Sequence, residues 1–241
     1  MKTEIYIATH KKTSFPKSDD YIPIHVGKNL SEVDLGIIGD DTQSNISYLN
    51  KSFCELTALY WIWKNSKAEN VGLVHYRRYF ITHNIGEIFY NKNIITCKEI
   101  EEKLKNCDVI LPEKERVAYY KIMMPVQLQY AISHNNKDWK ILGEFIKENK
   151  PDYYDAFKKV SSSFYISCYN MFIMNKSILN NYAQWLFDIL LSISEKKDIS
   201  KYDAYQSRIY GFMSERLLNV YFYKHKDDFN ICYLPVDKLE L

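Results

Sequence analysis

Short apolar runs alternate with longer amphipathic stretches along the 241 residues of this chain. Short runs rich in β-branched and aromatic residues, bounded by turn residues, are typical of buried strands. The predicted strands cover residues 2–9, 22–26, 71–74, 108–111, 164–174 and 231–234. Gly, Asp and Asn punctuate residues 28–45 and predict a loop, whereas residues 113–126 show no clear period and predict an irregular segment.

Apolar residues at helical spacing fill most of the intervals between these strands. The clearest helix begins near Ile46, because apolar residues then recur at steps of three and four as far as Trp63. Thr96, with Glu99 three positions later, forms a capping box for a helix over 96–106. Further helices are predicted over 127–134, 137–148, 152–159, 178–193 and 205–220. This alternation predicts one α/β domain over residues 1–241, with a mainly parallel central sheet flanked by helices.

Composition and charge indicate which kinds of partner and compartment to expect for this protein. The chain carries 32 basic and 30 acidic residues, a formal net charge of +2, which disfavours a nucleic-acid partner. The five cysteines are scattered without a CxxC pair and no signal-peptide pattern opens the sequence, so a cytoplasmic, reducing compartment is expected. No apolar run reaches the length of a membrane span, although peripheral contact with the inner face of the cell membrane stays open.

The segment His75-Tyr76-Arg77-Arg78-Tyr79 directly follows the predicted strand at 71–74. Ligands of open α/β sheets bind beyond the carboxyl ends of the strands, and guanidinium groups match phosphate oxygens. The two arginines, with the neighbouring histidine, therefore predict a diphosphate site, where either tyrosine can stack on a base or sugar. Alternate residues of an extended segment face opposite sides, so one arginine is expected to face the ligand. Surface arginines paired with carboxylates are the alternative.

Two loops add polar groups at the same edge of the predicted sheet. Thr9, His10 and Lys11 follow the first strand, and Asp40, Asp41 and Asn45 precede the helix that begins at Ile46. Carboxylates in this position can hold ribose or sugar hydroxyls, and a helix N-terminus favours an anion. An ordinary capping loop is the alternative for the second group.

Two further pairs are candidates for proton transfer. His134 and Asp138 are four residues apart and would share a face of a continuous helix, where they can orient a hydroxyl or supply a general base. The alternative is a capping aspartate beside a surface histidine. Glu215 and Arg216, on the last long helix, form either an internal ion pair or a carboxylate directed into the site.

Several common motifs do not occur in the sequence. It has no Walker A loop, no GxGxxG and no GxSxG, which disfavours P-loop ATP hydrolysis and dinucleotide redox chemistry. It also lacks Asp-x-Asp, the pair that commonly holds the metal in nucleotide-sugar enzymes. No cofactor is therefore firmly implied, no metal ligands are assigned, and the use of Mn²⁺ or Mg²⁺ stays open.

Eight blocks, in order along nearly the whole chain, carry a resemblance to a known family. They are 7–11 (IATHK), 23–27 (PIHVG), 45–47 (NIS) with Asn50, 54–61 (CELTALYW) with 63–65 (WKN), 72–80 (GLVHYRRYF), 170–174 (NMFIM), 185–190 (WLFDIL) and 211–217 (GFMSERL). On these blocks the sequence resembles a bacterial family of capsular and exopolysaccharide glycosyltransferases long described as a domain of unknown function. One departure is Gln43-Ser44, where the family often has Gly-Asp.

The resemblance implies a GT-A-like (Rossmann-like) fold and a nucleotide-sugar donor, UDP-linked, with galactose in its pyranose or furanose form as the sugar. It implies an oligosaccharide or lipid-linked acceptor in capsular, exopolysaccharide or O-antigen synthesis. It places residues 75–79 where related enzymes have Asp-x-Asp, and Asn170 near the acceptor. A non-catalytic nucleotide- or glycan-binding subunit of a polysaccharide assembly complex is the alternative function.

The sequence hypothesis assigns every candidate residue a role. If the reaction inverts the anomeric configuration, Asp138 is the preferred candidate for the base and Glu215 is the second candidate. His134 is expected to lie beside Asp138. The expected donor contacts are Thr9, His10, Lys11, Asp40, Asp41, Asn45, His75, Tyr76, Arg77 and Arg78. The expected acceptor contacts are Tyr79, Asn170 and Arg216.

Overall fold

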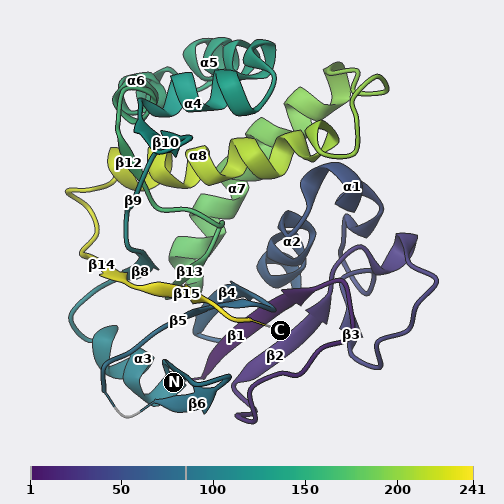
Figure 1. Ribbon diagram of the computed structural model, residues 1–241, viewed down its shortest axis with the longest axis vertical. Coiled ribbons are helices and arrows are strands. Elements are labelled where there is room, and N and C mark those ends of the chain that lie inside the picture. The colour runs from purple at the N-terminus through teal and green to yellow at the C-terminus, as the bar shows by residue number, and fades with distance from the viewer. Residues whose placement is uncertain (1, 85, 241) are drawn as a thin grey trace. The chain divides into compact units, whose positions relative to one another are not determined.

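The computed structural model describes residues 2–84 and 86–240, which divide into two compact units (Figure 1). Unit 1 holds the residues up to Glu113, Met171–Ala183 and the residues from Phe229 onward. Unit 2 holds Lys114–Asn170 and Gln184–Asp228. Each unit is thus assembled from separate stretches of chain. The single domain expected over residues 1–241 stays a prediction.

Unit 1 is built on a mixed sheet, to which the described residues contribute nine strands. Its main order is β14-β8-β13-β4-β1-β2-β3, and β5 extends from β4 and pairs with β15. The strands are β1 (Thr3–Thr9), β2 (Tyr21–His25), β3 (Ile38–Gly39), β4 (Asn70–His75), β5 (Arg78–Phe80), β8 (Val109–Pro112), β13 (Phe172–Asn175), β14 (Ile231–Leu234) and β15 (Val236–Lys238). The β1–β2, β1–β4, β2–β3 and β8–β14 ladders are parallel. β13 runs antiparallel between β4 and β8, and the short β5 is antiparallel to both of its partners. The predicted α/β fold with a mainly parallel central sheet is confirmed along this main path.

Helices cover both faces of the sheet at β1, whose seven residues are all buried. Residues alternate between the two faces of a strand. On one face the hydroxyl of Thr3 donates to the carboxylate of Glu101 in α3 (Cys97–Lys103) at 2.9 Å. On the other face the ring of Tyr6 lies 5.8 Å from that of Trp61 in α2 (Leu56–Asn65). Figure 1 shows the two helices on opposite sides of the sheet.

The single helix predicted from Ile46 to Trp63 is wrong in its first half. The chain forms a 3-10 turn at Ser47–Leu49 and a short α1 (Asn50–Phe53) before α2 begins. Cys54 interrupts the helix with a positive φ of 52°. The amide of Asn50 donates to the carbonyl of Cys54 (2.8 Å) and to the hydroxyl of Thr57 (3.0 Å), so a side chain stabilises this break in place of the regular backbone bonds.

Two other sequence expectations change in detail. The strand predicted over 164–174 is split into β12 (Tyr165–Ile166) and β13, because Tyr169 and Asn170 adopt positive φ angles of 75° and 52° between them. The segment 113–126, expected to be irregular, contains β9 (Glu115–Arg116), β10 (Ala118–Tyr119) and β11 (Ile122–Met123). β10 and β11 form a small hairpin, and β9 pairs with β12. A second hairpin, β6 (Glu87–Phe89) with β7 (Lys92–Ile94), belongs to unit 1.

Unit 2 is mainly helical, and the predicted helices are confirmed with small shifts of their bounds. Its helices are α4 (Val126–Ser133), α5 (Asn136–Asn149), α6 (Tyr154–Ser161), α8 (Ile209–Lys224) and the part of α7 (Lys176–Lys196) from Gln184 onward. Aromatic packing joins them: the rings of Trp139 and Phe157 stack 5.0 Å apart between α5 and α6. The apolar periodicity of the sequence is therefore satisfied by helix-on-helix packing in this unit.

We expect Gly27→Ala to lower the free energy of unfolding by about 2 kcal/mol or more, because two costs add at this position. Gly27 has a φ of +68°, and a Cβ there would lie 2.5 Å from Oδ1 of Asn50, whose amide is held by its own hydrogen bonds. Gly36 has the same φ of +68° but no atom within 4 Å of the added carbon.

Gly36→Ala is the matched control, and it should cost about 1 kcal/mol from backbone strain alone. Urea denaturation of both variants measures the difference. Equal losses would show that Asn50 yields freely and that the packing explanation is wrong.

Candidate functional site

The carboxyl ends of three neighbouring strands meet at one edge of the sheet in unit 1. Thr9 is in register with His25 at the end of β2, and Ala8 is in register with His75 at the end of β4. Parallel pairing places these ends side by side, which is where open α/β sheets bind ligands. The segments Thr9–Lys11 and His75–Tyr79, expected from the sequence to form one site, are thus brought together.

Tyr76 and Arg77 form the two-residue turn between β4 and β5, since His75 pairs directly with Arg78. The backbone N–H of Tyr76 donates to the carbonyl of Ala8 at 3.1 Å, which keeps the start of the turn against β1. The turn therefore presents its side chains at the edge where the strands end.

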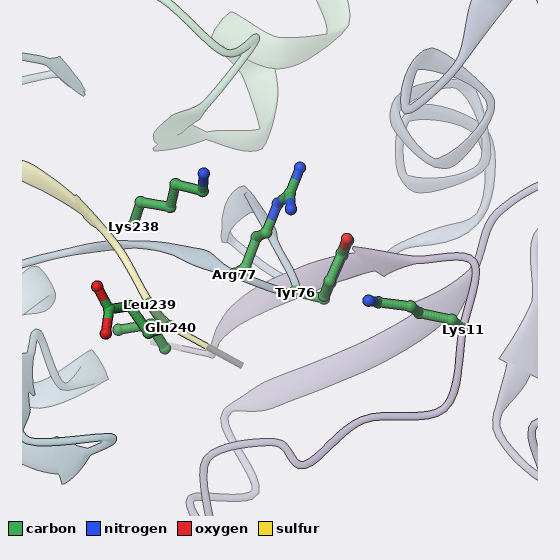
Figure 2. A pocket seen from close by; sticks show the side chains of 6 residues that line it. All are labelled: Lys11, Tyr76, Arg77, Lys238, Leu239 and Glu240. Carbon is green, nitrogen blue, oxygen red and sulfur yellow. The ribbon is translucent and has the colours of Figure 1, made fainter.

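A cavity of about 290 Å³ lies at this turn. Its lining residues are Lys11, Tyr76, Arg77, Lys238, Leu239 and Glu240 (Figure 2). They come from the end of β1, the β4–β5 turn and the segment around the end of β15. Of the two arginines, Arg77 lines the cavity and Arg78 does not.

Positive charge dominates the cavity wall. The Nζ of Lys11 lies 5.1 Å and the Cζ of Arg77 lies 5.5 Å from the centre of the Tyr76 ring. In the described chain, neither these two side chains nor Lys238 has a carboxylate within 4 Å, and Nε of Arg77 is buried without a hydrogen-bond partner. Uncompensated cations around a small cavity attract an anion, and phosphate oxygens suit them best.

Thr9 and His10 support the cavity from the end of β1. Thr9 is fully buried, and its hydroxyl donates to the carbonyl of Lys11 (2.8 Å) and accepts from the Lys11 N–H (3.3 Å). These bonds fix the bend that carries Lys11. The exposed ring of His10 lies edge-on to Tyr76 at 5.5 Å.

The carboxylate of Asp40 is occupied by the protein itself. Asp40 is fully buried and accepts from the N–H groups of Gly27 (2.8 Å) and Lys28 (3.1 Å) and from the hydroxyl of Ser47. Asp41, by contrast, is exposed at the surface. Of the two aspartates expected to hold donor hydroxyls, the structure favours Asp41.

Asn45 and Tyr79 have local structural partners. The amide of Asn45 donates to the carbonyl of Asp41 at 2.9 Å and so shapes the same loop. Tyr79 is fully buried, with its ring 5.8 Å from that of Tyr21 and 5.5 Å from that of Phe89. Burial raises the pKa of the Tyr79 hydroxyl. The structure favours a packing role for Tyr79 over the acceptor contact that the sequence suggested.

A second cluster lies within unit 2, around α8. The carboxylate of Glu215 accepts from the N–H of Tyr169 (3.0 Å) and pairs with Arg216 (2.8 Å). Arg216 also donates to Oε1 of Gln129 at 2.9 Å, and the amide of Asn170 donates to the carbonyl of Gly211 at 3.3 Å. The structure therefore brings together Glu215, Arg216 and Asn170. Tyr169 and Asn170 form a turn there, and both have strained positive φ angles.

His134 belongs to the same cluster. Its ring stacks on Phe212 at 3.9 Å and lies 4.8 Å from Tyr130. Burial, together with the positive charges of Arg216 and Arg208, lowers the pKa of His134 to about 4. Among the described residues, Nδ1 of His134, the hydroxyl of Tyr130 and Nε of Arg216 are buried without hydrogen-bond partners. Such a concentration is typical of a site that binds a polar ligand.

The expectation that His134 and Asp138 share one helix face is wrong. α4 ends at Ser133, His134 has an extended conformation (φ −135°, ψ −169°), and α5 begins at Asn136. Asp138 accepts from the hydroxyl of Tyr202 at 2.7 Å and lies 3.5 Å from Nζ of Lys197. Its side chain is 2% exposed, against 23% for Glu215, so the structure favours Glu215 as the accessible carboxylate.

Two parts of the strand-end site were not assigned from the sequence. Lys238, Leu239 and Glu240 line the cavity, but no pattern in the C-terminal residues distinguishes them. His25 is 1% exposed, its Nδ1 is buried without a partner in the described chain, and burial lowers its pKa. Its place at the end of a predicted strand was the available signal.

Within residues 2–84 and 86–240, no group of three or more His, Cys, Asp or Glu side chains is arranged to hold a metal ion. No helix in this part of the chain is both long and apolar enough to cross a membrane.

The fold and the strand-end cavity define an α/β protein with a mainly cationic cavity at the carboxyl ends of its parallel strands. Residues 4–226 match the model of the family described as a domain of unknown function, DUF4422, and the chain belongs to this family. It is also similar to the apo structure of WbbM, a bifunctional glycosyltransferase, with a TM-score of 0.88 and 28% sequence identity. The match covers 100% of this chain and 46% of that one, so the chain spans about half the length of WbbM. No curated protein matches the chain. The predicted family and the glycosyltransferase-like α/β fold are both confirmed.

We expect His134 to make stability fall with acidity. Its pKa is about 4 in the folded protein and about 6.5 in the unfolded chain, so the unfolded chain binds the extra proton between these values. The contribution of neutral His134 to the free energy of unfolding is fully present above pH 6.5 and is lost as the pH falls toward 4. His134→Phe should reduce the loss of unfolding free energy between pH 7 and pH 5 by about 1 kcal/mol, a value that allows for solvent screening.

Urea denaturation at both pH values measures this effect. His83→Gln is the control, because it removes an exposed histidine and leaves His134 in place. A His134→Phe variant with the full wild-type acid sensitivity would contradict the assignment.

Proposed function

We propose that this chain is a glycosyltransferase that moves a sugar from a UDP-linked donor to an oligosaccharide or lipid-linked acceptor. The observation that carries the proposal is the cavity at the carboxyl ends of β1 and β4, where Lys11, Arg77 and Lys238 supply three positive charges against the single carboxylate, Glu240, among the described lining residues. The similarity to a bifunctional glycosyltransferase along the whole of this chain supports the same reaction class.

The cationic cavity suits the donor diphosphate. In sugar transfer the bond between the anomeric carbon and the diphosphate oxygen breaks, and the electron pair leaves with the diphosphate. Fixed cations next to that oxygen stabilise the developing negative charge and lower the barrier. Arg77 is the proposed principal contact, with Lys11 beside it, and the ring of Tyr76 offers a face for the base or the sugar.

Glu215 is the proposed base if the reaction inverts. An acceptor hydroxyl forms the new bond to the anomeric carbon, and its proton must pass to a basic group. The carboxylate of Glu215 is partly exposed, and its pairing with Arg216 fixes its orientation. Asn170 and Arg216, which flank it, are the proposed acceptor contacts.

The finer assignments depend on the family resemblance. We propose galactose, in its pyranose or furanose form, as the transferred sugar, and capsular, exopolysaccharide or O-antigen synthesis as the pathway. The scattered cysteines, which form no CxxC pair, support a cytoplasmic site of action. The donor panel described below tests the sugar directly.

We expect UDP to bind the wild type and Arg77→Ala to weaken that binding by about 1–3 kcal/mol, the usual loss of a hydrogen bond to a charged group. Calorimetric titration measures both affinities. Lys12→Ala is the control, because Lys12 is exposed, adjacent to Lys11 and not part of the cavity wall. Unchanged UDP affinity in Arg77→Ala would show that the diphosphate does not bind in this cavity.

The same titration with manganese and again with EDTA decides how the diphosphate is held. Binding that persists in EDTA supports protein cations as the partners. Binding that requires manganese would transfer this role to a metal ion held by exposed carboxylates such as Asp41.

We expect Glu215→Gln to lower turnover by about 100-fold or more while UDP binding stays unchanged, because an amide still accepts from Tyr169 but cannot take a proton. Release of UDP from a panel of UDP-hexoses, UDP-galactose included, in the presence of acceptor glycans measures turnover. Glu148→Gln, on the exposed side of α5, is the control. Turnover equal to the wild type would exclude Glu215 as the base.

The alternative function makes a distinct prediction for the wild type. A non-catalytic binding subunit would bind UDP or a glycan without releasing UDP from any donor in the panel. That outcome would favour the alternative over the enzyme.

A further inference from the structure

One wall of the cavity is built by the C-terminal strap, which we define as residues 236–240. β15 pairs antiparallel with β5, so that Lys238 lies opposite Arg78. The N–H of Leu239 then donates to the carbonyl of Arg77 at 2.9 Å. The strap is thus bonded through its backbone to the same turn that presents Arg77.

Side chains on the strap anchor it and set its direction. Asp237 pairs with Lys92 of β7 at 2.6 Å, and Leu239 is 2% exposed. Successive residues of a strand point to opposite sides. Because Asp237 is held toward the β6–β7 hairpin, Lys238 points the other way, to the cavity that it lines.

The cations of the cavity are spread along its length. Figure 2 shows Lys238 at one side, Lys11 at the other, and Arg77 with Tyr76 between them. One phosphoryl group offers fewer oxygens to these cations. Two linked phosphoryl groups carry more charge and can reach more of the row at once.

We propose that the C-terminal strap completes this site as a diphosphate clamp, with Lys238 as a phosphate-binding residue that makes the site prefer diphosphates to monophosphates. The inference rests on the proposed function, because the diphosphate is that of the nucleotide-sugar donor. It also goes beyond the family match, which ends at residue 226 and so does not include Lys238. Glu240 places one carboxylate on the same wall, and the three cations outnumber it.

The test compares ligands that differ by one phosphoryl group. UDP, UMP, inorganic pyrophosphate and inorganic phosphate are titrated into the wild type and into Lys238→Ala. We expect Lys238→Ala to weaken UDP and pyrophosphate by about tenfold or more, and UMP and phosphate by a much smaller factor. Pyrophosphate and phosphate make the comparison independent of the base.

Two further variants separate the clamp from net charge and from folding. Lys98→Ala removes one exposed lysine of α3, outside the cavity, and should leave every affinity as in the wild type. Lys238→Arg keeps the positive charge and should retain most of the preference for diphosphates. Urea denaturation of each variant verifies that the fold is intact.

The outcomes distinguish this inference from the proposed function. The clamp is wrong, and the donor site stands, if the wild type binds UDP and Lys238→Ala binds it equally well. The same conclusion follows if Lys238→Ala lowers the affinity for UMP by the same factor as the affinity for UDP. If the wild type binds neither UDP nor pyrophosphate, the donor site and the clamp are both overturned.

Discussion

The parallel pairing of β1 with β2 and β4 is the constraint on which the rest of unit 1 depends. Because all three strands run in the same direction, their carboxyl ends meet at one edge, and Thr9, His25 and His75 become neighbours. The buried register of β1 leaves no freedom to slip, since a shift of one residue would exchange its two covered faces. The β4–β5 turn, and with it Arg77, inherits its position from this pairing.

Both units keep polar groups in states that folding alone does not favour. In unit 1, three cations and the carboxylate of Glu240 line a small cavity, and in unit 2, Nδ1 of His134 and the hydroxyl of Tyr130 are buried without hydrogen-bond partners in the described chain. Tyr169 and Asn170 add backbone strain beside Glu215. Such costs are usually retained where a ligand later supplies the missing partner. This shared property is the reason to propose both clusters as binding sites.

The strand-end site could be found from the sequence where chemistry and pattern coincide. Arg77 was identifiable because its segment, residues 75–79, directly follows an apolar run, and apolar runs predict strands. Lys238 was not, because nothing in the pattern of the last residues says that β15 returns to pair with β5. Asp138 shows the opposite error: its spacing from His134 suggested one helix face, but spacing has that meaning only if the helix is continuous, and it ends at Ser133.

The sequence by itself determined the alternation of strands and helices, the near-neutral charge and the cationic segment after β4, since periodicity and composition are local properties. It also carried the family resemblance, block by block. Only the tertiary structure decided which arginine lines the cavity, that Asp40 is satisfied by Gly27 and Lys28, and that the C-terminal strap closes the wall. These features depend on contacts between residues far apart in the chain, and local patterns of hydrophobicity do not encode such pairings.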